Sequence, residues 1–313
     1  MRLLVTRRQT EAVEAAIAAE LDACFRHDEA PLTEAEARAA LADYDLILPT
    51  LGDSFGAGAF AGPVRAKMLA NFGVGYNHID VEAARAAGVT VSNTPGAVTD
   101  ATADIAMTLI LISARRAGEG ERMLRAGRWT GWQPTQMLGL HVTGKRLGII
   151  GMGRIGKAIA KRAHFGFGME IVFFNRSAVT DPGCPARQVA FSEALGADIV
   201  VIAVPATPET HHLIDADAFS QMQPHAHLIN IARGDIVQES DLIAALQARR
   251  IAGAGLDVYE FEPKVPKALI ALENVTLLPH LGTAAEEVRS AMGFMALDNL
   301  RAFRDGTPPP NAL

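Results

Sequence analysis

The sequence predicts an α/β protein with a Rossmann-type doubly wound parallel sheet and a second, smaller flavodoxin-like α/β domain. Short, nearly continuous apolar segments recur along the chain, as expected for parallel strands that are covered on both faces. Segments with helical spacing alternate with these strands. A Gly151-x-Gly153-x-x-Gly156 sequence joins one such strand to the next helix. The length of 313 residues suits two domains, each with its own core.

The composition excludes several classes of protein. Apolar residues make up 49% of the chain and charged residues 20%, which argues against disorder. The net charge is −6 without any block of like charge, so we expect neither nucleic acid nor a membrane surface as partner. The apolar segments are too short for a secretory signal or a membrane span. Two cysteines, Cys24 and Cys184, cannot form a disulfide framework or a cysteine metal cluster, and we expect a cytoplasmic protein.

The first part of the chain predicts the smaller domain. Strands are expected at residues 3–5, 45–50, 68–70 and 89–91. A helix is expected at residues 11–21, and Thr33 with Glu36 forms a capping-box pattern that starts another helix. A last helix, residues 284–304, is expected to return to this domain. We therefore assign residues 1–96 and 286–313 to one domain and residues 97–285 to the other.

Two stretches outside the glycine turn attract attention. Gly73 and Gly75 lie in a loop whose backbone N–H groups could receive a carboxylate, although a glycine-rich turn without ligand explains them equally well. The nearby His78 is more simply structural. Residues 127–141 lack periodicity and contain Trp129 and Trp132, which suggests a dimer-forming arm or, almost as readily, a core anchor.

The glycine turn carries the clearest chemistry. A strand is expected at residues 142–150, a helix at 157–165 and a second strand at 170–174. In a dinucleotide-binding turn, Gly151 permits the tight turn, Gly153 lets a pyrophosphate approach the backbone, and Gly156 lets helix and strand pack closely. The phosphates then lie on the helix N-terminus. The alternative is a tight turn that binds nothing.

The end of the second strand bears on the choice of cofactor. An acidic residue there would hold the ribose hydroxyl of NAD, but this chain has Asn175-Arg176-Ser177. A guanidinium and a hydroxyl, without a carboxylate to repel a phosphate, favour NADP(H) over NAD(H). A solvated surface arginine is the simpler alternative.

Further strands are expected at residues 199–204, 227–232, 253–258 and 275–278, giving about six in the sheet. Arg233, Glu262 and His280 stand at or beyond the ends of the last three. Each has an ordinary explanation as a surface charge, a loop carboxylate or a buried histidine. Because ligands bind at the carboxyl ends of such strands, the three together predict an acid/base site.

Several motifs carry a resemblance to a known family. They are Val204-Pro205-x-Thr207-Pro-Glu-Thr, Asn230-Ile-Ala-Arg-Gly-Asp, Gly255-Leu-Asp-Val-Tyr-Glu-Phe-Glu-Pro and Pro279-His-Leu-Gly-Thr, with the segments from Asn71 to Asp80 and Asn93-Thr-Pro-Gly. In this order they resemble the D-isomer-specific 2-hydroxyacid dehydrogenases. Within that family the chain most resembles the glyoxylate/hydroxypyruvate reductases, including D-glycerate dehydrogenases.

The resemblance implies roles for particular residues. Arg233 would hold the 2-oxo acid, His280 would donate the proton and Glu262 would be its partner, while Leu51, Val74 and Gly75 would line the substrate pocket. The residues expected to contact or frame the cofactor are Thr102, Gly151, Met152, Gly153, Arg154, Ile155, Gly156, Asn175, Arg176, Ser177, Val204, Pro205, Ile231, Ala232, Asp257, His280 and Gly282.

The chain departs from its relatives at a few places. Asn175-Arg176 replaces the acidic residue of NAD-specific members, and Ile231 stands where many relatives carry a small polar residue. Gln136 and Met137 lie in a region that is more aromatic in some reductases. These differences concern cofactor choice and substrate preference rather than the acid/base residues.

The sequence therefore predicts an NADPH-preferring, homodimeric reductase that converts small 2-oxo acids such as glyoxylate or hydroxypyruvate to glycolate or D-glycerate. One alternative keeps the fold but acts as another D-2-hydroxyacid dehydrogenase or oxidises phosphite or formate, although formate oxidisers of this fold carry glutamine where this chain has Glu262. The other is a dinucleotide-sensing interaction protein without catalysis. Corepressors on this scaffold tend to have long extra tails, and the chain ends soon after Pro308.

Overall fold

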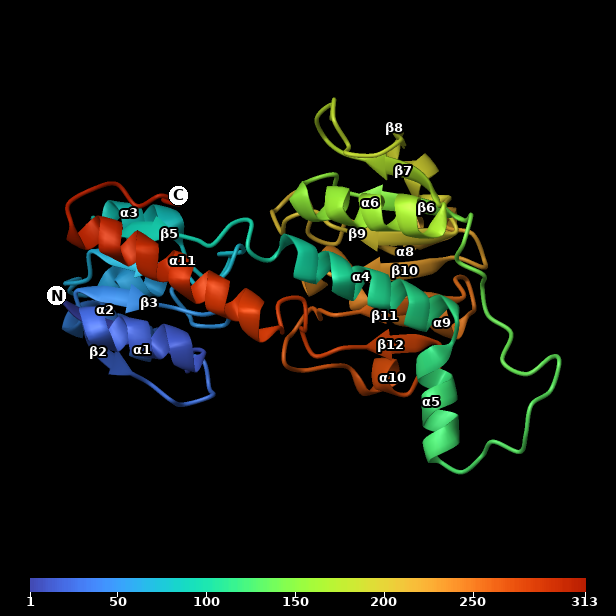
Figure 1. Ribbon diagram of the computed structural model, residues 1–313, viewed down its shortest axis with the longest axis horizontal. Helices are drawn as coiled ribbons and strands as arrows, with labels where there is room; N and C mark the ends of the chain where they lie inside the picture. The colour runs from blue at the N-terminus through green and yellow to red at the C-terminus, as the bar shows by residue number, and fades with distance from the viewer. The chain divides into compact units, whose positions relative to one another are not determined.

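The computed structural model describes residues 1–313 and forms two compact units (Figure 1). The smaller unit comprises Met1–Val98 and Thr283–Leu313, and the larger unit comprises Thr99–Gly282. Each unit contains one sheet in which every pair of neighbouring strands is parallel. The predicted α/β fold with two parallel sheets is confirmed.

The sheet of the larger unit has the strand order β12-β11-β10-β9-β6-β7-β8. Its seven strands are β6 (Arg146–Ile150), β7 (Glu170–Phe174), β8 (Ala186–Gln188), β9 (Ile199–Ile202), β10 (His227–Asn230), β11 (Gly253–Leu256) and β12 (Val275–Leu277). The chain builds outward from β6 to β8 and then returns to the other side of β6 with β9. This reversal is the switch point of a doubly wound sheet, where ligands bind at the carboxyl ends of the strands.

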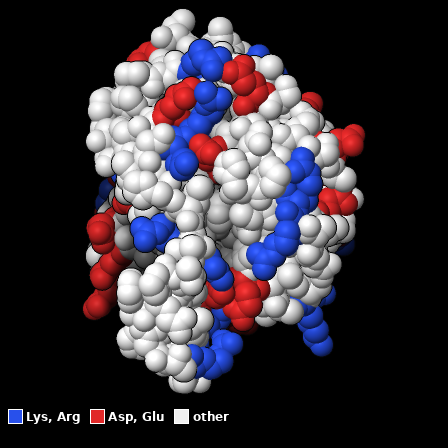
Figure 2. Space-filling model, turned by 90° about the vertical axis from the view of Figure 1, so that its right-hand side faces the viewer, with Lys and Arg blue, Asp and Glu red and all other residues white.

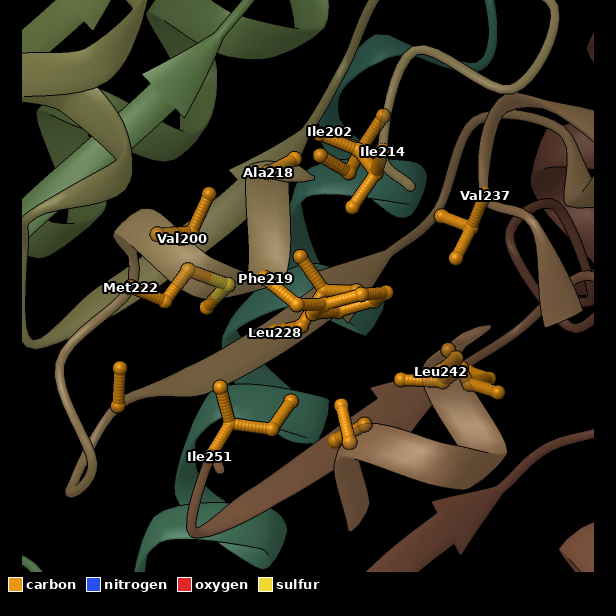
Figure 3. Close-up of a cluster of buried hydrophobic side chains, with 14 of the residues drawn as sticks. Val200, Ile202, Ile214, Ala218, Phe219, Met222, Leu228, Val237, Leu242 and Ile251 are labelled. Carbon is orange, nitrogen blue, oxygen red and sulfur yellow. The ribbon is translucent and has the colours of Figure 1, made fainter. Parts of the chain in front are cut away.

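Helices cover both faces of this sheet. On one face lie α4 (Thr99–Ala114) and α6 (Arg154–Phe167), whose Leu109 and Ile159 pack with Ile149 and Phe173 of the strands. On the other face lie α7 (Phe191–Leu195), α8 (Ala216–Gln221), the 3-10 turn η2 (Gly234–Ile236), α9 (Glu239–Gln247) and α10 (Lys267–Ile270). Figure 3 shows Phe219 of α8 against Leu228 of β10 in this second core. Because both faces are covered, the inner strands β6, β7, β9, β10 and β11 are largely apolar.

The sheet of the smaller unit has the order β2-β1-β3-β4-β5, which is the flavodoxin-like order. Its strands are β1 (Arg2–Val5), β2 (Asp22–Phe25), β3 (Leu46–Leu48), β4 (Met68–Ala70) and β5 (Thr90–Ser92). One face is covered by α2 (Glu34–Asp43), the 3-10 turn η1 (Ala57–Ala61) and α3 (Val81–Ala86). The other face is covered by α1 (Glu11–Glu20) and by α11 (Glu286–Arg304), whose Leu297 packs with Leu3 and Val5. Helix α11 thus belongs to the smaller unit together with the N-terminal part of the chain.

Local signals located some elements better than others. The capping box before α2 is complete, because Thr33 and Glu36 each bind the other's backbone N–H. In contrast, β6 begins only at Arg146, since the chain turns at Gly144 with a φ of 74°. Strand β8 was not expected, because its Ala-Arg-Gln sequence is largely exposed and lacks an apolar pattern.

A polypeptide arm leaves the larger unit between α4 and β6. It consists of α5 (Ala117–Arg125), which has no buried residue, and of residues 126–145, which contain no helix or strand. Figure 1 shows residues 126–145 as a long loop beyond the sheet. Trp129 is 52% exposed and Trp132 is 80% exposed, so neither anchors a core within one chain.

The surface carries charge of both signs. On the face drawn in Figure 2, basic and acidic side chains are interspersed and separated by uncharged surface. None of the helices combines the length and the apolar character that crossing a bilayer requires.

Candidate active site

The residues expected at the site in the larger unit follow the carboxyl ends of its strands. Gly151 follows β6, Asn175 follows β7, and the Val204-Pro205 turn lies just beyond β9. Ile231 to Arg233 follow β10, Asp257 follows β11, and His280 lies three residues beyond β12. Because all seven strands are parallel, these positions share one edge of the sheet. The remaining expected residues of this unit, Thr102 and Glu262, reach the same group through contacts described below.

The geometry of the glycine turn fits a dinucleotide. Gly151 has a φ of 103°, and a Cβ there would lie 2.6 Å from the carbonyl oxygen of Ala203. A Cβ on Gly156 would collide with the carbonyl oxygen of Gly151, so helix and strand pack too closely for any side chain. At Gly153, in contrast, an added Cβ would meet nothing within 4 Å. The backbone is therefore open at the one glycine where a pyrophosphate would approach.

The first turn of α6 adds donors to this turn. The helix begins at Arg154, and no side chain caps it at Gly153. The N–H groups of a helix's first turn have no partner within the helix, and the helix dipole favours an anion there. The chain thus offers Gly153, Arg154 and Ile155 as a place for phosphate oxygens.

Asn175 links the glycine turn to the loop after β7. Its side-chain oxygen accepts a hydrogen bond from the Met152 N–H at 3.2 Å, and its amide nitrogen donates to the carbonyl oxygen of Ser177 at 2.9 Å. Arg176 and Ser177 are exposed, and the guanidinium of Arg176 has no hydrogen bond or ion pair within the chain. Asn175 is therefore structural in this loop, whereas Arg176 is left available to a ligand.

Asp257, Thr102 and Gly282 come together although they are far apart in the sequence. The buried Asp257 carboxylate accepts hydrogen bonds from the N–H groups of Leu281 at 2.6 Å and Gly282 at 2.8 Å. The Thr102 hydroxyl donates to the Gly282 carbonyl oxygen at 3.2 Å. Burial raises the pKa of Asp257, and the two N–H groups oppose this effect. These bonds fix the backbone directly after His280.

His280 and Glu262 form a pair. Nδ1 of His280 lies 2.9 Å from Oε2 of Glu262, and the two side chains are 31% and 32% exposed. His280 has a φ of 55°, which is uncommon for a residue other than glycine. Its backbone N–H donates to the carbonyl oxygen of Asp257 at 3.0 Å, so the unusual conformation is held from β11. Both side chains remain partly accessible, as an acid/base pair must be.

Glu262 is held in its ionised form by its neighbours. Burial alone would raise the pKa of Glu262, but the hydrogen bond and the charge of His280 lower it below its ordinary value. The Tyr259 N–H, which donates to Oε1 at 3.0 Å, and the charge of Arg233 act in the same direction. Glu262 is therefore a carboxylate near neutral pH, and it meets the His280 ring at hydrogen-bond distance.

Arg233 is partly buried and incompletely bonded. Its Nη1 donates to the carbonyl oxygen of Ala232 at 2.7 Å, but its buried Nε has no acceptor. Burial lowers the pKa of Arg233, while the charges of Glu262 and Asp235 raise it. A guanidinium keeps its charge in proteins, so a buried N–H without an acceptor is a cost that an anionic ligand would remove.

The three residues expected to bind substrate in the smaller unit lie in two loops. Leu51 follows β3, and Val74 and Gly75 follow β4. Asn71 donates to the carbonyl oxygens of Gly73 and Gly75, and Asn93 donates to that of Val74 at 2.9 Å. No acceptor in the chain takes the N–H of Val74 or Gly75. The carbonyl groups are thus engaged, and two N–H groups stay available for a carboxylate.

Sequence reasoning missed several residues that support the site. Tyr259 donates its hydroxyl to the Leu278 carbonyl oxygen at 2.8 Å, and Asn71 and Asn93 shape the loop of the smaller unit. Tyr259, Asn71 and Asn93 stand within the quoted motifs, but only the fold shows which atoms they hold. Gln188 was also missed, because β8 itself was not expected.

A doubly wound sheet with an open glycine turn, and a histidine–carboxylate pair at the same edge, define the class of dinucleotide-dependent oxidoreductases. The model of the D-isomer specific 2-hydroxyacid dehydrogenase NAD binding domain matches residues 107–282, which is more than half of the chain. The chain belongs to the D-isomer specific 2-hydroxyacid dehydrogenase family and is an NAD(P)-dependent enzyme.

Individual relatives agree with this assignment. A glyoxylate reductase from Thermococcus onnurineus is 42% identical over 275 residues, which cover 86% of this chain and 82% of the relative. The crystal structure of the TT0316 protein from Thermus thermophilus has a TM-score of 0.93 at 38% identity and covers both chains completely. An NADPH-dependent glyoxylate/hydroxypyruvate reductase from Sinorhizobium meliloti, solved with NADP and malonate, has a TM-score of 0.88 at 33% identity. It covers 100% of this chain and 96% of that chain.

Proposed function

We propose that the protein is an NADPH-preferring reductase of small 2-oxo acids, which converts glyoxylate to glycolate and hydroxypyruvate to D-glycerate. Relatives at 40% to 42% identity that cover most of the chain are glyoxylate reductases, which supports this substrate class. The Sinorhizobium meliloti enzyme supports both the substrate class and the cofactor.

One observation carries the proposal. Glu262 is bonded to His280 at 2.9 Å and lies within the electrostatic influence of Arg233, whose buried Nε has no acceptor. Glu262 therefore interacts both with His280, the proposed proton donor, and with Arg233, the proposed anion-binding cation. A 2-oxo acid needs both, because its carboxylate must be held while its oxo group receives a proton.

The chain's residues divide the work of reduction. When bound, the nicotinamide supplies the hydride that the carbonyl carbon receives. Arg233 holds the substrate carboxylate in two-point geometry and polarises the oxo group, which a lysine ammonium would not match. His280 gives a proton from Nε2 to the oxo oxygen, since Nδ1 faces Glu262. Glu262 keeps the ring oriented and the imidazolium favoured.

The preference for NADPH rests on the loop after β7. Arg176 and Ser177 are exposed there, and Asn175 stands where a carboxylate would repel a phosphate. Arg176→Ala should raise the KM for NADPH roughly 10- to 100-fold, as expected for the loss of a charge-assisted hydrogen bond. The KM for NADH should change little. Equal effects on both cofactors would contradict the preference.

The two units have separate roles in this proposal. The larger unit binds the dinucleotide, and the smaller unit presents the N–H groups of Val74 and Gly75 to a carboxylate, with Leu51 as an apolar wall. In this proposal residues 1–96 and 286–313 form the substrate-binding domain, and residues 97–285 form the dinucleotide-binding domain. The two free cysteines, Cys24 and Cys184, suit a reducing cytoplasm.

The arm supports a homodimer. Leu124, Trp129, Trp132 and Leu138 are between 52% and 80% exposed within one chain. Exposed tryptophan and leucine side chains in one segment are typical of a surface that is covered by another chain. A second copy is the partner that is always present at equal concentration.

An absorbance assay tests the function directly. The protein is mixed with NADPH and glyoxylate or hydroxypyruvate, and the nicotinamide absorbance is followed. We expect it to fall, and we expect Arg233→Lys to lower kcat/KM about 100-fold through the loss of two-point binding. The equilibrium binding of NADPH to Arg233→Lys should stay close to that of the original chain. A constant absorbance with a panel of 2-oxo acids would contradict the proposal.

A further inference from the structure

The loop after β7 is held by one side chain of the edge strand β8. Gln188 donates from Nε2 to the carbonyl oxygens of Asn175 and Ser177, at 3.0 Å each. Its Oε1 accepts a hydrogen bond from the N–H of Val179, also at 3.0 Å. Gln188 can reach these atoms because β8 pairs with β7, where Gln188 lies opposite Phe173 near the end of that strand. A single amide therefore binds three backbone groups of the loop 175–179.

A second clamp acts from inside the loop. Asn175 accepts the Met152 N–H and donates to the Ser177 carbonyl oxygen at 2.9 Å and to the Ser177 hydroxyl at 3.2 Å. Arg176 thus lies between two residues whose backbone is tied down, while its own side chain is exposed and makes no hydrogen bond, and its charge acts on the Glu209 carboxylate. The framework of the loop is fixed, and the guanidinium that would bind an anion is accessible.

We propose that Gln188 is a positioning residue that sets the enzyme's selectivity for a 2′-phosphorylated dinucleotide. It holds the loop in the conformation in which Arg176 and Ser177 receive the 2′-phosphate. This inference rests on the proposed preference for NADPH. Without Gln188 the loop would have to be ordered at the moment of binding, and the lost entropy would weaken the interaction.

Gln188 should affect binding of the 2′-phosphate of the cofactor and not binding of its pyrophosphate. Its three bonds all end on the loop 175–179. The glycine turn also has an anchor outside this loop, because the Gly151 N–H donates to the carbonyl oxygen of Phe174 in β7 at 2.9 Å. Pyrophosphate binding at Gly151 to Gly156 should therefore persist when Gln188 is replaced. The loss should appear with the phosphorylated cofactor and not with NAD.

Gln188→Met tests the inference, because methionine keeps the length of the side chain and removes its hydrogen bonds. The dissociation constants of NADP⁺ and NAD⁺ are measured by calorimetry without substrate for Gln188→Met, Arg176→Ala and the double variant. Gln223→Met is the matched control, because Gln223 is exposed in the same unit and its side chain makes no hydrogen bond. The KM values for NADPH and NADH are measured in parallel.

We expect Gln188→Met to weaken NADP⁺ binding about tenfold, the size of one or two net hydrogen bonds, and NAD⁺ binding less than about twofold. In the Arg176→Ala background it should add less than about twofold, because both residues serve the same phosphate. Equal weakening of both cofactors, or full additivity in the double variant, would overturn the inference. If Arg176→Ala lowers the NADP⁺ selectivity and Gln188→Met does not, only the inference fails. If Arg176→Ala leaves the selectivity unchanged, the proposed NADPH preference fails first.

Discussion

Both carboxylate oxygens of Glu262 are engaged: Oε2 lies 2.9 Å from Nδ1 of His280, and Oε1 accepts the Tyr259 N–H at 3.0 Å. The carboxylate is thereby fixed from one side by the backbone and faces the imidazole with the other. A histidine whose Nδ1 is bonded in this way presents Nε2 as the atom that exchanges a proton. The contact with Glu262 thus determines which ring nitrogen of His280 can act on a substrate.

Replacing Glu262 should change the pH dependence of reduction. Reduction needs a protonated His280, so its rate should fall as pH rises and the ring loses its proton. The lowered pKa of Glu262 keeps it a carboxylate, and a carboxylate that is hydrogen-bonded to a histidine ring favours the charged form of that ring. In Glu262→Gln the decline of kcat/KM should therefore move to lower pH, and the maximal rate should fall roughly 100-fold.

The comparison needs a carboxylate that lies away from the site. Glu170 begins β7 at the opposite edge of the sheet and pairs with Arg146 on the surface. Glu170→Gln should keep the original pH profile. An unchanged profile in Glu262→Gln would remove Glu262 from its proposed role.

Tyr259 should support the acid/base pair without taking part in the chemistry. Its N–H binds Glu262 and its hydroxyl binds the Leu278 carbonyl oxygen, two residues before His280. Burial raises the pKa of Tyr259, so the phenol remains a donor at neutral pH. Tyr259→Phe should destabilise the fold by about 1 kcal/mol and lower kcat several-fold, with the NADPH dissociation constant unchanged.

The readout that separates positioning from general stability is the pH profile. If the lost hydroxyl bond lets the segment before His280 move, the profile of Tyr259→Phe should shift in the direction of the Glu262→Gln profile. A loss of stability with an unchanged kcat and profile would show that Tyr259 is only structural.

The fold was predictable where local sequence and tertiary packing agree. Most strands of both sheets, the capping box at Thr33 and the glycine turn each carry a strong local signal and appear in the structure, whereas β2, which has no buried residue, was not expected. Strand β8 has no such signal, because an exposed edge strand needs no apolar pattern. Its presence depends on pairing with β7, which a single sequence does not display.

The residues of the site were likewise predictable only in part. His280, Glu262 and Arg233 were expected because they stand at strand ends, and the structure brings the first two into contact. The supporting bonds were not predictable, because Tyr259 and Gln188 act through backbone atoms that lie near them only after folding. Reactive residues can be predicted from a pattern of residue types. Residues that only hold other groups in place are harder to predict in this way.

The exposed tryptophans of the arm should be required for dimerisation. Trp129 is 52% exposed and Trp132 80% exposed, and such side chains contribute most at the centre of an interface. The double variant Trp129→Ser, Trp132→Ser should elute as a monomer at about 1 µM, where the original chain remains a dimer. Light scattering coupled to size exclusion measures the mass. Phe165→Ser is the control, because Phe165 is 71% exposed on α6 outside the arm. A monomeric original chain, or a dimeric double variant, would contradict the assignment.

His227 should make the larger unit less stable in mild acid. It begins β10, is 6% exposed, and its Nδ1 lies 2.8 Å from the hydroxyl oxygen of Ser113. Burial, with a smaller contribution from His225, lowers the pKa of His227 to about 4.

The sign of the effect follows from proton binding. The ordinary histidine pKa is about 6.5, so between about pH 6.5 and 4 the unfolded chain binds a proton that the folded chain excludes. The free energy of unfolding should therefore fall as pH falls through this range, by about 2 kcal/mol between pH 7 and pH 5. In His227→Gln, where the amide can still meet the Ser113 hydroxyl, this contribution should be lost. The difference between the melting temperatures at pH 7 and pH 5 should then shrink, whereas the exposed His141→Gln should keep the original difference. Equal differences in His227→Gln and the original chain would show that His227 does not drive the acid sensitivity, and that its ring takes up a proton without leaving the folded core.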